Sequence, residues 1–409
     1  MTDSQRSPVP PPPARRFYPQ LEGLRAVASL GVLTTHVAFQ TAATTWPIVG
    51  EVLGRLDLAV ALFFALSGFL LWRPYAAAAR GDRTRADAQP PNVRRYLRHR
   101  FVRIWPAYAL VVVVVLLLLP QARGASATVW LANLTLTQVF VPLTLAPGLT
   151  QMWSLSVEVA FYLLLPLIGL ALRKVCGARA HRRIPIIIAV AVVSLGWTWV
   201  TRLMVLPAGV EARNWVPGYL SWFAVGLVLA EVMAALSAGA ISTGSRAVRI
   251  AANRPLMFAV FVAAYALACT PIAGPVGLGD MTHMTYLVKM LLGAIASAAV
   301  LAPLVLAPVT DERARFRFLD SRPMNALGRW SYGIFIWHLA VLSVVFGLFG
   351  IPMFSGHFWQ VWLLTVVLTV AVSAASYAFV EEPLRAALKR SEGKIPDQTA
   401  TATATSANA

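Results

Sequence analysis

Residues 24–39 read LRAVASLGVLTTHVAF, an apolar stretch that carries an arginine at position 25 and a histidine at position 36. Eleven residues of α-helix span about 16.5 Å and end roughly 20° apart around the axis. Arg25 and His36 therefore share one helix face at two depths. A polar group that faces lipid is costly, so we expect this face to look into a bundle or a hydrated cavity. A structural histidine bonded to a neighbouring helix would explain this stretch equally well.

The composition of the whole chain is typical of a membrane protein. Of its 409 residues, 58% are hydrophobic and 13% are charged, where a soluble domain carries about 25% charged residues. The net charge of +18 would suggest nucleic-acid binding in a soluble protein. Here the basic residues lie in short segments between apolar runs, so we expect no nucleic-acid partner. Cys176 and Cys269 lack metal-ligand spacing, and we expect no metal site.

The apolar runs predict an all-α, polytopic membrane helix bundle of about ten transmembrane helices. The stretch 127–147 is apolar too, but its Asn, Gln, Thr and Pro residues favour an interfacial or re-entrant segment. The membrane domain covers 17–390, and the polar tails 1–16 and 391–409 are predicted to be disordered. The ten runs are 22–40, 58–75, 101–119, 152–172, 184–204, 216–236, 255–271, 286–308, 330–350 and 359–380.

The distribution of basic residues predicts how the bundle is oriented. With the N-terminus inside, thirty Lys and Arg residues fall in or beside the inner segments and five fall in the outer ones. A miscounted span would invert every later loop, so this bias supports ten spans with both termini cytoplasmic. We therefore predict a multi-pass protein of the cell inner (cytoplasmic) membrane.

Further polar groups occur at membrane depth in other runs. Ser67 lies beside Gly68 near the middle of the second run, and Glu158 lies about two turns inside the fourth. His338 lies about 13 Å into the ninth run. A buried unpaired carboxylate is expensive, so Glu158 needs a partner or a function. Two histidines and a glutamate at overlapping depth favour a functional site.

Arg100 and Arg103 stand three residues apart at the inner end of the third run. Ordinary positive-inside anchoring explains such a pair on its own. The alternative is an anion clamp for a phosphorylated ligand that approaches from the cytosol.

Taken together, these motifs resemble the acyltransferase-3 family of integral membrane O-acyltransferases. The matching stretches occur in the family's order over nearly the whole chain, and they are specific as a set although each is weak alone. Two features depart from the family pattern. Val159 follows Glu158 where many members have a second acid or a glutamine, and no added extracytoplasmic domain is expected within these residues. The stretches are LEGLRAVASLGVLTTHVAF (21–39), LFFALSGFLL (62–71), RHRFVRIWPAY (98–108), WSLSVEVAFYLLLPL (153–167), GRWSYGIFIWHLAV (328–341) and EEPLR (381–385).

The resemblance implies transfer of an acyl group, usually acetyl, from a cytosolic acyl-CoA to a hydroxyl. The acceptor would be a sugar, a glycolipid, an envelope polysaccharide or a similar molecule, and its identity and the acyl chain length stay open. Acyl-CoA would act as a co-substrate, with no bound cofactor. Acceptor choice would then lie with the membrane domain and its outer loops.

Each polar residue has an expected role in this reaction. His36 would be the catalytic base, because a neutral imidazole can take the proton of an attacking hydroxyl. Glu158 would orient or polarise His36, or hold the acceptor. Arg25, Arg100 and Arg103 would bind the phosphates of the donor.

Two further possibilities stay open at this point. Ser67 and His338 are secondary candidates, and a covalent acyl-Ser67 or acyl-histidine relay is one alternative to direct transfer. The alternative function is a proton-coupled membrane transporter, because intramembrane His and Glu residues also mark proton relays. Against a transporter, the sequence lacks paired broken helices and detectable halves.

Overall fold

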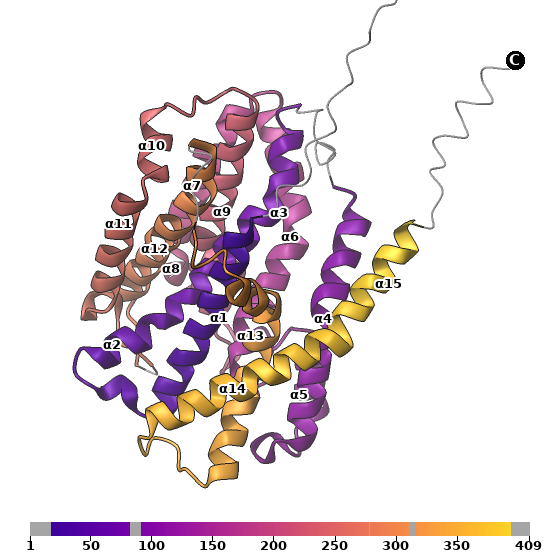
Figure 1. Cartoon of the computed structure of the whole chain (residues 1–409), viewed down its shortest axis with the longest axis vertical. Coiled ribbons are helices and arrows are strands. Elements are labelled where there is room, and N and C mark those ends of the chain that lie inside the picture. Colours follow the sequence, from indigo (N-terminus) through magenta and orange to yellow (C-terminus); the bar gives the residue numbers. More distant parts are fainter. Residues whose placement is uncertain (1–17, 82–90, 278, 311–315, 394–409) are drawn as a thin grey trace, which may run out of the picture.

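The described chain folds into a bundle of helices without a β-strand (Figure 1). The computed structural model describes residues 18–81, 91–277, 279–310 and 316–393. The all-α prediction is confirmed for this part of the chain. The longer helices are α1 (Pro19–Gln40), α3 (Ala59–Ala78), α4 (Val93–Leu118), α6 (Trp153–Cys176), α9 (Val216–Ser237), α12 (His283–Thr310), α13 (Arg322–Phe349) and α14 (Phe358–Ser376). The shorter ones are α2 (Val49–Gly54), α5 (Ala127–Leu134), α7 (Arg183–Ser194), α8 (Trp197–Thr201), α10 (Arg246–Ala252), α11 (Arg254–Ala268) and α15 (Glu382–Gly393).

The number of membrane-crossing helices differs from the expected ten. Seven helices in the described ranges are long and apolar enough to cross a membrane, or eight if the bent pair α10–α11 is one span. The helix axis bends by 69° between the two helices of that pair. Predicted span 184–204 is divided between α7 and the five-residue α8, and α1 is helical but is not among the seven. A span needs about 20 predominantly apolar residues. Neither α7 nor α8 is that long, and α1 contains several polar and charged residues. The count of ten therefore stays a prediction.

The segment predicted to be interfacial or re-entrant contains only one short helix. Its helix α5 has eight residues, about 12 Å of rise, which is too short to cross a bilayer. The end of α5 is fixed to α4 through Tyr108, whose hydroxyl donates to the carbonyl of Asn133 over 2.6 Å.

Helices α3 and α9 cross with their backbones in close approach because glycines stand at the crossing. A Cβ added to Gly226 would lie 2.0 Å from the carbonyl oxygen of Ala65, and one added to Gly68 would lie 2.4 Å from that of Phe223. Small residues let helices approach closely in membranes. Gly68 thus fixes the rotation of α3, and with it the direction of the neighbouring Ser67.

A buried carboxylate ties three helices together at one end of the bundle. Glu231 on α9 is fully buried and is paired with Arg80, two residues past the end of α3, and with Arg183 on α7, the latter at 3.1 Å. Trp72 of α3 donates its indole N–H to the same carboxylate over 2.8 Å. Buried ions need such pairing and hydrogen bonding, so this cluster sets the positions of α3, α7 and α9.

The C-terminal helices form one long element that crosses the bundle obliquely (Figure 1). Helix α14 passes through a π-helical turn, Tyr377–Glu381, into α15. Near its end, Glu392 accepts a hydrogen bond from Arg95 of α4 over 2.9 Å. The predicted tails 1–16 and 391–409 lie outside the described residues, except that 391–393 form the end of α15.

Candidate active site

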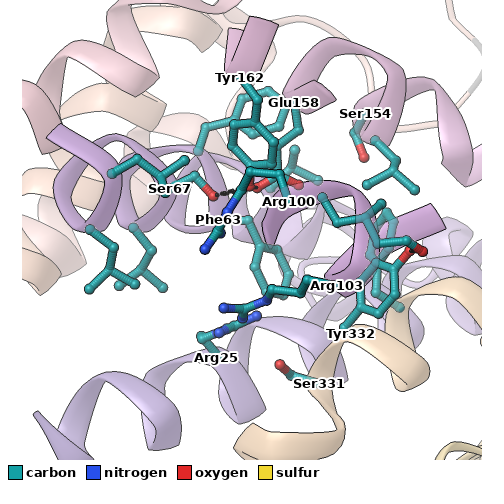
Figure 2. A pocket seen from close by; sticks show the side chains of 18 residues that line it. Arg25, Phe63, Ser67, Arg100, Arg103, Ser154, Glu158, Tyr162, Ser331 and Tyr332 are labelled. Atoms are coloured by element: carbon teal, nitrogen blue, oxygen red, sulfur yellow. Dashed lines mark hydrogen bonds between the residues drawn. The ribbon is translucent and has the colours of Figure 1, made fainter. Parts of the chain in front are cut away.

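A cavity of about 430 Å³ lies between α1, α3, α4, α6 and α13. We call it the arginine cavity, because Arg25, Arg100 and Arg103 line it. Figure 2 shows these three side chains extending into the space between Ser67 and Ser331. The remaining polar lining consists of Ser67, Ser154, Glu158, Tyr162, Ser331 and Tyr332. The arginines predicted to bind the donor come from two distant motifs and meet in one place.

The charge in the arginine cavity is mostly positive. Three guanidinium groups and a single carboxylate, that of Glu158, line it. Arg25 has a distant partner in Glu22 at 3.9 Å. Among the described residues, Arg100 and Arg103 form no ion pair, and the Nε of Arg100 is buried without a hydrogen-bond partner. Guanidinium groups with free donors at membrane depth favour an anionic ligand.

Glu158 lies at the centre of a hydrogen-bonded group on the wall of this cavity. Its Oε1 accepts hydrogen bonds from the hydroxyls of Ser67 and Tyr162. The two hydroxyl oxygens are themselves 3.0 Å apart. Tyr162 follows Glu158 by four residues, so the two side chains lie on one helix face. That spacing is visible in the sequence, although Tyr162 was not among the predicted site residues.

A second cavity, of about 650 Å³, contains His36 in its lining and is called the histidine cavity. It shares Val60, Ser154 and Phe335 with the arginine cavity, so the two spaces lie back to back. The wall combines rings, amides and charged groups. These include Phe39, Gln40, Asp57, Gln151, Trp153, Arg213, Asn214, Tyr219, Trp222, Asp280, Tyr286 and Lys289.

One ion pair in the histidine cavity did not emerge from the sequence. Lys289 of α12 lies 2.5 Å from Oδ2 of Asp57, which follows α2. The other carboxylate oxygen, Oδ1, is buried without a hydrogen-bond partner in the described chain. The two residues are 232 positions apart, and no spacing rule links them.

His36 and His338 meet although they lie 302 positions apart in the chain. Nδ1 of His36 is 3.2 Å from Nε2 of His338, and the ring centroids are 5.0 Å apart. His338 is fully buried and lines neither cavity.

The predicted site residues thus form two groups. Arg25, Arg100, Arg103, Ser67 and Glu158 line the arginine cavity. His36 lies in the histidine cavity with His338 beside it.

The expected link between Glu158 and His36 is not among the hydrogen bonds of the described residues. Glu158 bonds Ser67 and Tyr162 instead, and His36 bonds Val32 and His338. The two residues lie at different depths. Glu158 lines the same cavity as Arg25, whereas His36 follows Arg25 by eleven residues along α1 and lines the other cavity.

Comparison with known proteins gives one consistent result. The family model described as an acyltransferase domain, of the acyltransferase-3 type, matches residues 18–380. The peptidoglycan O-acetyltransferase OatA of Listeria monocytogenes is 23% identical over 399 residues, 91% of this chain and 56% of that protein. The O-acetyltransferase OatA of Staphylococcus aureus is 24% identical over 389 residues, 90% of this chain and 57% of that protein. The chain therefore spans little more than half the length of these relatives.

No solved structure matches the chain. The family match covers all the helices that line the two cavities, from α1 to α13, and the apolar helices identify a multi-pass membrane protein. The chain belongs to the acyltransferase-3 family.

Proposed function

We propose that this protein is a membrane O-acyltransferase that moves an acyl group, in the first instance acetyl, from a cytosolic acyl-CoA to a carbohydrate hydroxyl. One observation supports this most strongly. A cavity lined by three arginines and a cavity lined by a histidine share Val60, Ser154 and Phe335. Such an arrangement suits a phosphorylated donor on one side and a proton-accepting centre on the other.

The arginine cavity is the proposed donor site. Arg100 and Arg103 have donors available for the phosphates of coenzyme A, and phosphate groups pair well with guanidinium. Arg25 and His36 are about 16.5 Å apart along α1. The long pantetheine arm of coenzyme A is suited to bridge that separation and present the thioester near the shared wall.

The histidine cavity is the proposed acceptor site. Its amide, carboxylate and amine groups can hydrogen-bond sugar hydroxyls, and its aromatic rings offer apolar faces for sugar C–H groups. The relatives named above are O-acetyltransferases, and the Listeria protein is named for peptidoglycan. An envelope polysaccharide or a lipid-linked sugar is therefore the acceptor class that we propose for this chain, at the inner membrane of the cell.

The proposed reaction is a direct transfer. His36 removes the proton of the acceptor hydroxyl as the oxygen attacks the thioester carbonyl carbon. The C–S bond then breaks, the thiolate leaves as coenzyme A, and the proton returns from His36 to the sulfur or to solvent. The Ser67–Glu158–Tyr162 group would hold the hydroxyl of Ser67 beside the path of the acyl group.

Thioester turnover by the purified protein tests this function. In detergent, with acetyl-CoA and an added saccharide acceptor, we expect free coenzyme A and an acylated sugar in equal amounts. A proton-coupled transporter would instead show uptake driven by a pH gradient in vesicles and would cleave no thioester. That second outcome would replace the enzyme proposal with the transporter.

A further inference from the structure

The environment of His338 determines which of its ring nitrogens carries hydrogen. His338 is on α13 and is 0% exposed. Its Nδ1 lies 2.7 Å from the carbonyl oxygen of Phe335 and 3.2 Å from that of Ile334. A carbonyl oxygen only accepts hydrogen bonds, so Nδ1 of His338 must be the N–H. In the neutral ring, Nε2 of His338 then has a free lone pair.

The same argument applies to His36. Its Nδ1 lies 2.8 Å from the carbonyl oxygen of Val32, so this nitrogen is also an N–H. The N–H of His36 therefore faces the lone pair on Nε2 of His338 over 3.2 Å. A doubly protonated His338 would direct one N–H at another. The histidine pair can therefore bind one further proton, and that proton binds at Nε2 of His36.

His36 Nε2 is the nitrogen that substrate can reach. His36 lines the histidine cavity, and among the described residues its Nε2 makes no hydrogen bond. His338 lines neither cavity, so it acts on the reaction only through His36.

We propose that His338 is a positioning residue that, together with the carbonyl of Val32, holds His36 in its Nδ1–H tautomer and so leaves Nε2 of His36 free as the base. When that nitrogen takes the proton of the acceptor hydroxyl, the imidazolium keeps its Nδ1–H directed at Nε2 of His338 and at the carbonyl of Val32. No proton passes to His338, and the chain of hydrogen bonds spreads the new charge. The catalytic part of this inference rests on the proposed acyltransferase function.

Two variants separate the acceptor role of His338 from its bulk. His338→Asn can still donate to the carbonyl of Phe335 but is too short to accept from His36. His338→Gln can direct its amide oxygen at Nδ1 of His36. We expect kcat to fall about ten- to a hundred-fold in the Asn variant, the range for a lost hydrogen bond to a charged group. The Gln variant should recover a large part of that loss, and KM for the donor should not change in either.

Ser343→Ala is the matched control, because Ser343 lies on α13, lines neither cavity and bonds only the carbonyl of Leu339 in the described chain. It should keep wild-type kcat. If the Asn and Gln variants both fold and turn over at the wild-type rate, the positioning role is wrong. An equal loss of kcat in the His338→Asn and His338→Gln variants, with a raised KM for the donor, would show that His338 contributes packing alone. That result would also overturn the proposal.

A measurement independent of activity tests the tautomer itself. In protein labelled with ¹⁵N-histidine, His36→Gln and His338→Gln assign the two rings in NMR spectra. We expect the wild-type spectrum to show both rings neutral with hydrogen on Nδ1. In His338→Asn, only the carbonyl of Val32 is left to accept from Nδ1 of His36, so the share of the Nε2–H form of His36 should increase. A wild-type His36 with hydrogen on Nε2 would overturn the inference. If the tautomers are as expected but no thioester is cleaved, the pairing holds and the acyltransferase function fails, which removes the catalytic role.

Discussion

Ser67 on α3 donates a hydrogen bond to the carboxylate of Glu158 on α6, across 91 positions of the chain. Both residues line the cavity that contains the three arginines. Tyr162 donates to the same carboxylate oxygen, so Glu158 orients two hydroxyls at once. Glu158 is thus bonded within the arginine cavity and not to His36, which it was expected to orient or polarise if it did not hold the acceptor.

This geometry gives a test of direct transfer against an acyl-serine relay. Under direct transfer, Ser67→Ala loses a hydrogen bond to a carboxylate that Tyr162 still bonds, so turnover should stay within about tenfold of wild type. Ser297→Ala is the control, because Ser297 is a buried serine of α12 that lines neither cavity. Complete loss of activity, with an acyl adduct on Ser67 found by mass spectrometry of the wild type, would establish the relay instead.

The proposed donor site is tested with the arginines of α4. Arg100→Ala and Arg103→Ala each remove a charge-assisted contact of about 1.5–3 kcal/mol, so donor affinity should fall about ten- to a hundred-fold. Arg94→Ala is the matched control on the same helix, because Arg94 is exposed and lines neither cavity. Binding of a non-hydrolysable acyl-CoA analogue measures the effect. Unchanged affinity in all three variants, with poor membrane insertion, would make these arginines topology anchors.

The proposed base is tested with His36→Gln, which keeps a polar side chain of similar length but cannot cycle a proton near neutral pH. Turnover should fall by at least about a hundredfold, because general base catalysis contributes that much or more. Donor affinity should stay the same, because His36 is not in the arginine cavity. The control is Ser29→Ala, which changes a buried residue on the same helix and should leave turnover unchanged. Wild-type turnover in His36→Gln would remove His36 from the mechanism.

Membrane orientation is tested by single-cysteine labelling in a variant without Cys176 and Cys269. The positive-inside bias predicts that Gln121 is outside and Thr243 inside. A membrane-impermeant thiol reagent on intact cells should therefore label Gln121→Cys and spare Thr243→Cys, and both should react after permeabilisation. The reverse pattern in intact cells would invert the topology. Both positions are exposed in the structure.

The crossing of α3 and α9 is tested by Gly226→Ala. The new methyl group would lie 2.0 Å from the carbonyl oxygen of Ala65, so the helices must separate. Overpacking typically costs about 1–3 kcal/mol, so Tm in detergent should fall. Gly347→Ala is the control, because its added Cβ would meet nothing within 4 Å. An unchanged Tm in Gly226→Ala would show that the crossing is looser than described.

The sequence by itself determined the class of the fold and the family. Composition and apolar runs are averages over many residues, so they predict a helical membrane bundle without knowledge of any contact. The spacing of Arg25 and His36 gave a common helix face, because helix periodicity is local. Motif order gave the family. Hydropathy alone did not determine the number of spans, because the apolar run 184–204 does not reveal that the helix breaks near Leu195 and Gly196.

Only the tertiary structure decided which polar groups meet. Helix periodicity gives the direction of a side chain but not the neighbouring helix or its depth, and those depend on how small residues such as Gly68 let particular helices approach. The contacts of Glu158 with Ser67 and of His36 with His338 therefore join residues that are 91 and 302 positions apart in the chain. The division into two cavities has the same origin, because Val60 and Phe335 come from different helices and form a shared wall only when α3 and α13 pack in the bundle.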